Sequence, residues 1–153
     1  MNQSSLFQQE KSTPTRPAII ANIDGGARGN PGPAAFGVII RNSKGELIAE
    51  LSEYLGLQTN NFAEYSGLLA ALDYAVRENY PSLKIYSDSE LLVRQMQGRY
   101  KVNNPGLQQL FARAQSFVRK LQIFQIEHVL RERNKEADRL VNKTLDERAR
   151  AAR

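Results

Sequence analysis

The chain of 153 residues contains no cysteine and only one histidine. The lack of cysteine excludes disulfide bonds, zinc sites built from thiolates and cysteine nucleophiles, and it fits a reducing compartment. No apolar run approaches the roughly 20 residues that span a bilayer, and the first residues lack the apolar segment of a signal peptide. We therefore expect a cytoplasmic protein that does not enter a membrane.

The rest of the composition is that of an ordinary soluble domain. Hydrophobic residues make up 41% of the chain and charged residues 24%, which allows a sizeable core and a hydrated surface. Residues 1–17 are polar, contain two prolines and show no periodicity, so we expect a disordered tail there. Residues 18–150 are expected to form one domain that acts as a monomer, without an obligate protein partner.

Charge is unevenly distributed along the chain. The net charge is +5, but residues 94–153 hold fourteen Lys or Arg and six Asp or Glu, a balance of +8, which leaves −3 for residues 1–93. A basic surface favours a polyanion such as nucleic acid. A solvated basic helix surface would give the same composition, so charge alone does not decide between them.

Hydrophobic periodicity predicts an α/β fold. Residues 18–23, 36–40 and 46–55 have strand character and short connections, which indicates an antiparallel meander of three strands. Further strands at 83–86 and 123–129 alternate with helical segments, which favours parallel pairing. Helices are expected between Asn61 and Pro81, at 89–97, from about 103 to 121, and after Asn134 as an N-cap. One five-stranded mixed sheet with helices on both faces accounts for this order.

Four carboxylates stand at the ends of these expected elements: Asp24, Glu64, Asp88 and Asp138. Each has an ordinary structural explanation when taken singly. Asp24 precedes a glycine, as in many turns, and Glu64 forms a possible capping box with Asn61. Asp88 could cap the helix that follows it, and Asp138 would lie in a first helical turn, where the macrodipole favours an anion.

The joint placement of these carboxylates favours a common site. Asp24 and Asp88 come side by side if strand 18–24 pairs with strand 83–87, and the helix beginning near residue 61 can bring Glu64 to the same edge. Clustered carboxylates repel each other and lose hydration, so protons or a cation must compensate them. Four hard oxygen ligands suit Mg²⁺ or Mn²⁺ rather than zinc or copper.

Four segments occur in an order that resembles the type 1 ribonuclease H family. They are Asp24-Gly25-Gly26 with Asn30-Pro31-Gly32-Pro33, Thr59-Asn60-Asn61 with Glu64, Tyr86-Ser87-Asp88-Ser89, and Asn134 with Ala137-Asp138-x-Leu140. The resemblance covers about residues 18–148, with the family's order of strands and helices between the motifs. It implies a ribonuclease H-like fold and makes residues 18–150 a catalytic domain.

Members of this family cut the RNA strand of RNA–DNA hybrids, and the resemblance implies the same activity here. It implies that Asp24, Glu64, Asp88 and Asp138 are the catalytic residues and hold two Mg²⁺ ions, with Mn²⁺ as a substitute. By analogy, Asp24 bridges both ions, Glu64 and Asp88 support one, and Asp138 supports the other. Hydrolysis by two metal ions would leave 5′-phosphate and 3′-hydroxyl ends.

The resemblance also implies substrate contacts. Asn30, Asn60 and Asn61 are similar to residues that contact the hybrid in its minor groove, and Thr59 is similar to a DNA phosphate contact. Amide side chains both donate and accept hydrogen bonds, as recognition of a 2′-hydroxyl requires. Turn and cap chemistry would explain the same residues without a substrate.

Two features depart from the family pattern. Residues 98–105 are too few to form the basic helix-and-loop protrusion that grips the duplex in many relatives, although Arg99 and Lys101 supply some charge. The lone His128 either matches the mobile histidine that many relatives carry before the last carboxylate, or it ends a strand and the mobile histidine is missing. We favour the strand end, with Arg131 or Arg133 either binding phosphate or serving the structure alone.

Three hypotheses follow. The first is a Mg²⁺-dependent endoribonuclease that acts on RNA–DNA hybrids with little sequence preference. The second is a ribonuclease H-like nucleic-acid-binding module with weak catalysis, against which the complete carboxylate set argues. The third is a related metal nuclease that acts on another duplex, and a comparison of hybrid, duplex RNA and duplex DNA as substrates would separate it from the first.

Overall fold

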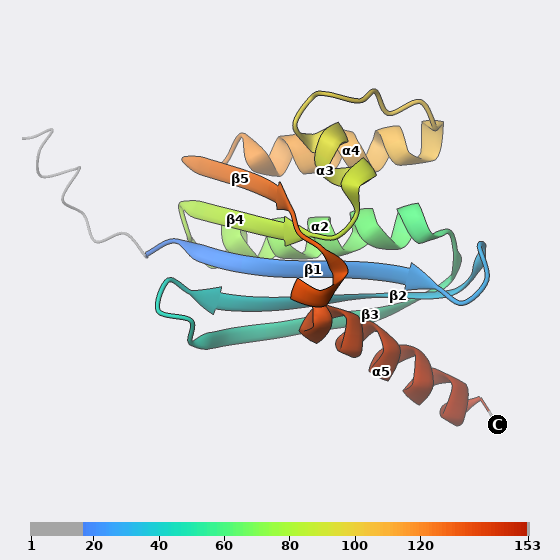
Figure 1. Ribbon diagram of the computed structural model, residues 1–153. Helices are drawn as coiled ribbons and strands as arrows, with labels where there is room; N and C mark the ends of the chain where they lie inside the picture. Colours follow the sequence, from blue (N-terminus) through green and yellow to red (C-terminus); the bar gives the residue numbers. More distant parts are fainter. Residues whose placement is uncertain (1–16, 153) are drawn as a thin grey trace, which may run out of the picture.

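The computed structural model describes residues 17–152, so the predicted tail of residues 1–17 lies almost entirely outside the described residues. A five-stranded sheet with the strand order β3-β2-β1-β4-β5 forms its centre (Figure 1). The elements in chain order are β1 (Ile19–Ala27), β2 (Gly32–Asn42), β3 (Leu47–Gln58), α2 (Asn60–Arg77), β4 (Ser82–Ser87), α3 (Glu90–Met96), α4 (Pro105–Val118), β5 (Ile123–His128), the 3₁₀ helix η1 (Arg131–Arg133) and α5 (Lys135–Ala151). Within residues 17–152, every helix is too short or too polar to cross a bilayer.

β1 is the middle strand of the sheet. It pairs antiparallel with β2 along its whole length, and parallel with β4 from Ile19 opposite Leu83 to Ile23 opposite Ser87. β3 extends the antiparallel side and β5 extends the parallel side. The predicted mixed sheet of a three-strand meander and two parallel strands is therefore confirmed. The parallel ladder stops one residue before Asp24, which places this carboxylate at the edge where β4 ends.

Helices cover both faces of the sheet, as expected. α2 packs on one face together with α3 and α4, and α5 crosses the other face over β1, β2 and β3 (Figure 1). The main core lies on the α2 side and includes alternating β1 residues, among them Ile19 and Ile23, which are fully buried. A smaller cluster of Ala35, Val141 and Leu145 lies under α5. Burial on both faces explains the nearly continuous apolar runs in β1 and β2.

Two glycines let the helices approach the sheet closely. A Cβ atom on Gly25 would lie 2.3 Å from the carbonyl carbon of Ala63 in α2, and one on Gly37 would lie 2.7 Å from the carbonyl oxygen of Ala137 in α5. Real side chains do not reach such distances, so any larger residue would push the helix away. The contact at Gly25 is what brings Glu64, the residue after Ala63, next to Asp24.

Two of the ordinary structural explanations considered for single carboxylates do not hold. Asp24-Gly25 is not a turn, because β1 continues to Ala27 and its ladder with β2 holds these residues in the sheet. The capping box at Asn61 is also wrong, because α2 begins at Asn60 and Thr59 is its N-cap. The Thr59 Oγ1 accepts a hydrogen bond from the Phe62 backbone nitrogen at 3.1 Å. Threonine and asparagine side chains can both accept a hydrogen bond from a free backbone N–H in the first turn of a helix. The sequence pattern therefore did not distinguish Thr59 from Asn61 as the N-cap.

Candidate active site

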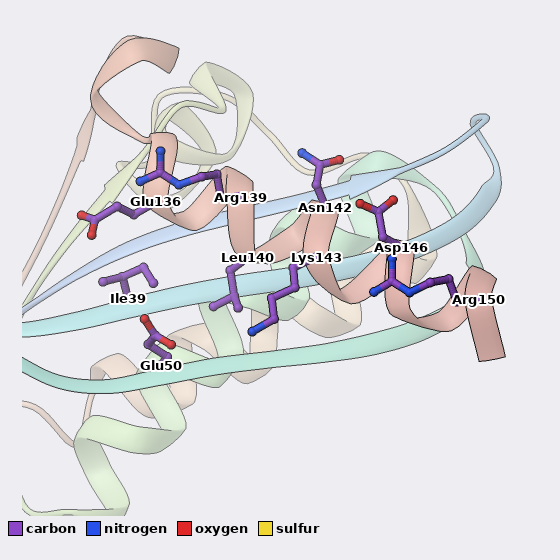
Figure 2. Close-up of a pocket in the computed structure, with 9 residues that line it drawn as sticks. All are labelled: Ile39, Glu50, Glu136, Arg139, Leu140, Asn142, Lys143, Asp146 and Arg150. Atoms are coloured by element: carbon purple, nitrogen blue, oxygen red, sulfur yellow. The ribbon is translucent and has the colours of Figure 1, made fainter.

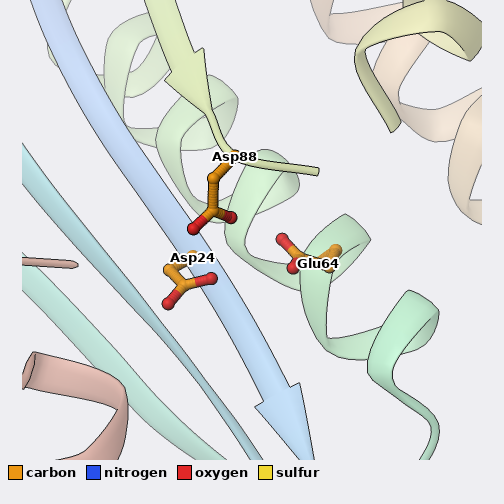
Figure 3. Close-up of side chains that lie close together, drawn as sticks. All are labelled: Asp24, Glu64 and Asp88. Carbon is orange, nitrogen blue, oxygen red and sulfur yellow. The ribbon is translucent and has the colours of Figure 1, made fainter. Parts of the chain in front are cut away.

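Three carboxylates converge where β1 passes the end of β4 and the first turns of α2 (Figure 3). Asp24, Glu64 and Asp88 each offer one oxygen, and these oxygens lie within 4.8 Å of one another. Asp138, the fourth residue of α5, lines the same hollow of about 410 Å³ and lies within hydrogen-bonding reach of Asp24. The structure thus brings together all four carboxylates that the sequence singled out.

The cluster is electrostatically unfavourable as it stands. Burial, then the charges of Asp88 and Asp138, raise the pKa of Asp24 to about 8. Burial, followed by the charges of Asp24 and Asp88, raises the pKa of Glu64 well above its ordinary value. Burial also raises the pKa of Asp88, against the opposing effects of the Arg131 charge and a hydrogen bond from Asn134. Protons or a bound cation are needed to hold these groups together.

Glu64 shows that a cation fits better than protons alone. Its Oε2 atom is buried and has no hydrogen-bond partner among residues 17–152. A buried polar atom without a partner costs roughly 1–3 kcal/mol, and more when it is charged. Carboxylate oxygens on three elements, close together and short of donors, form a donor set that suits a hard divalent cation such as Mg²⁺ or Mn²⁺.

The two arginines of the short helix η1 line different hollows. Arg131 lines the carboxylate hollow, and its charge lowers the pKa of Glu64 and Asp88 against the larger effect of burial. Arg133 lines a separate small hollow beside Lys135. His128 is the last residue of β5, opposite Ser87, and does not line the carboxylate hollow. The prediction that this histidine ends the strand is confirmed.

Asn134 is the buried residue that links the elements of the cluster. It is 1% exposed and precedes α5, but its side chain does not cap the helix as predicted. Its Nδ2 donates to the Ile23 carbonyl oxygen at 2.8 Å, and its Oδ1 accepts from the Asn22 Nδ2 at 3.1 Å. It also lies within hydrogen-bonding reach of Asp88 and lowers the pKa of that carboxyl against the effect of burial. These contacts replace a helix cap, so one amide joins β1, the end of β4 and the start of α5.

The predicted substrate residues lie next to the cluster, but they are already engaged in part. Asn60 and Asn61 line the carboxylate hollow, whereas Asn30, Thr59 and Asn61 line a neighbouring hollow of about 370 Å³. The Asn30 Oδ1 accepts from the Asn60 backbone nitrogen at 3.0 Å, and the Asn60 Oδ1 accepts from the Ala27 nitrogen at 2.8 Å. These bonds orient the two amides and leave their NH₂ groups and one oxygen lone pair each for a ligand.

Two further contributors to the site were not predicted from the sequence. The Gly25 nitrogen donates to the Asp24 Oδ1 at 2.9 Å, which only the strand register reveals. Arg28 lines the hollow and ties the end of β1 to α5 through an ion pair with Asp146 at 2.8 Å and a hydrogen bond to the Asn142 Oδ1 at 3.2 Å. An isolated arginine in a loop carries no pattern that could identify this role.

A second, larger hollow lies on the opposite flank of α5 (Figure 2). It measures about 550 Å³ and has a mixed lining of acidic, basic and apolar residues that includes Glu50, Arg139 and Lys143. Two of its acidic groups are already paired, Glu136 with Arg41 at 2.9 Å and Asp146 with Arg28 at 2.8 Å. None of the predicted site residues lines it, so the carboxylate hollow is the candidate site.

Comparison with known proteins agrees with this geometry. The model of the family described as "Reverse transcriptase-like" matches residues 22–144. The "Bifunctional protein Rv2228c" of Mycobacterium tuberculosis is 41% identical over 135 residues, which are 88% of this chain and 37% of that protein. The chain thus spans little more than a third of the length of this relative.

Two solved structures show the same architecture. The N-terminal RNase H domain of Rv2228c, fused to maltose-binding protein, has a TM-score of 0.85 and 40% identity, with 90% of this chain and 100% of that chain covered. LC11-RNase H1 in complex with RNA/DNA hybrid has a TM-score of 0.81 and 42% identity, with 86% and 99% covered. With its fold, its carboxylate cluster and these matches, the chain belongs to the reverse transcriptase-like family as a type 1 ribonuclease H.

Proposed function

We propose that residues 18–150 form an endoribonuclease that hydrolyses the RNA strand of RNA–DNA hybrids. The observation that carries this proposal is the convergence of the four carboxylates Asp24, Glu64, Asp88 and Asp138. The pKa values of the first three are raised, and Glu64 has a buried oxygen without a partner among the described residues. A related structure whose description includes a bound RNA/DNA hybrid supports the choice of substrate. Backbone and sugar contacts would give affinity with little sequence preference.

The four carboxylates would hold two divalent ions, which supply activation of a water molecule and neutralise charge on the leaving 3′ oxygen. Asp24 would contribute to holding both ions, because its carboxylate lies near those of Asp88 and Glu64 and within hydrogen-bonding reach of Asp138. The sheet and two helices fix these side chains before substrate arrives, which limits reorganisation. The product ends would be 5′-phosphate and 3′-hydroxyl.

The neighbouring amides would set the preference for RNA. The NH₂ groups of Asn30 and Asn60 can donate to acceptor atoms in the minor groove, since their oxygens are engaged within the protein. Asn61 is exposed and borders both hollows, so it can offer donor and acceptor to a 2′-hydroxyl. The Thr59 oxygen caps α2, which leaves its hydroxyl hydrogen for a DNA phosphate.

Cleavage of matched duplexes tests the proposal. Labelled RNA–DNA hybrid, duplex RNA and duplex DNA of one sequence are incubated with the protein in Mg²⁺, in Mn²⁺ and in EDTA. We expect cleavage of the RNA strand of the hybrid in either metal, none in EDTA, and 5′-phosphate ends on the fragments. Preferential cleavage of duplex RNA would favour the related nuclease, and binding without cleavage would favour the binding module.

The two arginines of η1 provide a matched pair for a second test. Arg131→Ala should lower kcat on the hybrid by roughly 10- to 100-fold, because a cation facing the carboxylates also faces the scissile phosphate. Arg133→Ala should stay within about twofold of the wild type, since Arg133 lines another hollow. His128→Ala should also retain wild-type turnover. Equal losses in the two arginine variants would contradict the assignment of Arg131.

A further inference from the structure

The hollow on the far flank of α5 takes no part in the proposed reaction. This outer hollow is lined by Ile39 of β2, Glu50 of β3 and seven residues of α5 between Glu136 and Arg150. Its volume is about 550 Å³, larger than the carboxylate hollow of about 410 Å³. Clefts of roughly 300–1,000 Å³ are the usual size for small ligands. The outer hollow therefore has the dimensions of a binding site of its own.

Three cations of α5 border the outer hollow. Arg139, Lys143 and Arg150 are spaced by four and seven residues, which places them on one side of the helix. All three are exposed, and within residues 17–152 none of them forms a hydrogen bond or an ion pair. Their donors are therefore available to a ligand.

The acidic residues of the lining leave this positive charge in excess. Glu136 is paired with Arg41 at 2.9 Å and Asp146 with Arg28 at 2.8 Å, and neither arginine lines the outer hollow. Glu50 is the one acid of the lining that has no ion pair in the described part of the chain. Three unpaired cations face a single unpaired carboxylate, so the hollow favours an anion.

The remaining lining selects the kind of anion. Ile39 is 3% exposed and Leu140 is half-buried, so both present apolar surface, and Leu140 and Lys143 project from α5 towards β3 (Figure 2). Apolar surface suits the face of a nucleotide base, and the Glu50 carboxylate accepts a hydrogen bond from a base amino group or a ribose hydroxyl. Guanidinium and ammonium groups bind phosphate. Inorganic phosphate alone would leave the apolar surface and Glu50 unused.

The outer hollow and the carboxylate hollow meet at α5. Asn142 lines both of them, and its Nδ2 donates to the Asp138 carbonyl oxygen at 3.1 Å. Asp146 lines the outer hollow and is paired with Arg28, which lines the carboxylate hollow. A helix with its side chains is about 10–12 Å wide. A strand that is cut at the carboxylates therefore reaches the outer hollow by crossing α5 once.

We propose that the outer hollow binds a nucleotide through its 5′-phosphate. Arg139, Lys143 and Arg150 hold the phosphate, and the base packs on Ile39 and Leu140. The nucleotide is either a free mononucleotide or the 5′-phosphorylated end of a cut RNA strand, and this second source rests on the function proposed above. In the second case the protein retains its product after the cut.

Binding in EDTA tests the proposal without any need for cleavage. AMP, adenosine and inorganic phosphate are titrated into the full chain, and methyl signals are followed by NMR. We expect AMP to bind at least about tenfold more tightly than either of the others, because each of them lacks half of the contacts. AMP should shift the signals of Ile39 and Leu140. It should leave those of Val141 and Leu145, which line the carboxylate hollow.

A pair of double variants tests the cations. Lys143→Ala with Arg150→Ala should raise the Kd of AMP at least about tenfold, because charge-assisted hydrogen bonds to the phosphate are lost. Arg119→Ala with Lys120→Ala removes two exposed cations beyond the end of α4 and should keep the wild-type Kd. An equal loss of affinity in both double variants would contradict the assignment.

Two oligoribonucleotides of one sequence, with a 5′-phosphate or a 5′-hydroxyl, identify the source of the ligand. Tighter binding of the phosphorylated strand assigns the cut strand, and binding of AMP alone assigns the free nucleotide. If neither phosphorylated probe binds more tightly than its unphosphorylated counterpart, or if inorganic phosphate binds as tightly as AMP, the proposal is overturned. Binding at the outer hollow without cleavage of hybrid in Mg²⁺ would refute the nuclease function alone. Cleavage without such binding would refute this site alone.

Discussion

Asp24→Asn is expected to lower hybrid cleavage by at least about 10³-fold while it stabilises the metal-free protein. The loss of a shared metal ligand removes several kcal/mol of transition-state stabilisation, and each 1.4 kcal/mol changes the rate about tenfold. The gain in stability has a separate cause. The amide replaces a 7% exposed carboxylate that is crowded by Asp88 and Asp138. Cleavage of labelled hybrid in Mg²⁺ and thermal unfolding in EDTA measure the two effects.

The stability effect has a defined pH dependence. The pKa of Asp24 is raised from 3.8 to about 8, so the folded protein keeps this proton when the unfolded chain has lost it. The contribution of the group to metal-free stability is therefore complete below about pH 4 and is lost as the pH rises towards 8. Asp24→Asn should make the decline of metal-free stability with rising pH less steep. It should raise the unfolding midpoint at pH 8 by roughly 5–10 °C, which corresponds to a few kcal/mol in the free energy of unfolding for a domain of this size.

The exposed Asp73 supplies the control, because Asp73→Asn removes the same charge from a surface pair with Arg77. That variant should keep both cleavage and the pH profile of unfolding. Addition of Mg²⁺ or Mn²⁺ at pH 8 should stabilise the wild type and the Asp73 variant more than the Asp24 variant. Full cleavage by Asp24→Asn, or a pH profile of unfolding identical to that of the wild type, would refute the proposed role.

Asn134→Ala is expected to lower both stability and cleavage. Truncation leaves the Ile23 carbonyl oxygen and the Asn22 amide without their buried partner and removes a donor from Asp88. Such losses cost roughly 2–4 kcal/mol in unfolding free energy. We expect kcat to fall about 100-fold, because Asp88 and Asp138 are no longer fixed relative to β1. Urea unfolding and cleavage over a range of metal concentrations measure the outcome.

Two further variants separate positioning from stability. Asn134→Asp keeps an acceptor for Asn22 but adds a charge beside Asp88 and removes the donor. It should therefore be less stable than Asn134→Ala in EDTA and regain more stability when Mg²⁺ is added. Val93→Ala, on the buried face of α3, should cost a similar amount of stability without loss of rate in the folded protein. If Val93→Ala loses as much activity as Asn134→Ala well below both unfolding midpoints, Asn134 serves stability alone.

The sheet and the four carboxylates could be predicted because both are visible in short stretches of the sequence. Strand and helix periods are set by burial, and each carboxylate follows or begins such a period. The strand that ends at His128 was predicted in the same way, from an alternating pattern that the structure bears out.

The contacts that support the carboxylates could not be predicted, because they join residues that are far apart in the sequence. Asn134 has the position of a helix cap, and only the long-range contacts with Asn22 and Ile23 show that its amide is used elsewhere. Gly25 looks like a turn residue, and its close contact with Ala63 depends on how α2 crosses β1. Thr59 and Asn61 are both good N-caps, so the helix start was off by two residues. Tertiary packing determines the roles of these residues, and a local sequence pattern carries no information about tertiary packing.

The long-range bond between Asn22 and Asn134 also bears on how the protein is made. The two residues are separated by 112 positions, so one carboxylate strand leaves the ribosome long before the helix that completes the set. A nascent chain that has not yet released α5 holds Asp24 without Asp138. The set of four carboxylates is therefore complete only after the last helix has folded onto the sheet.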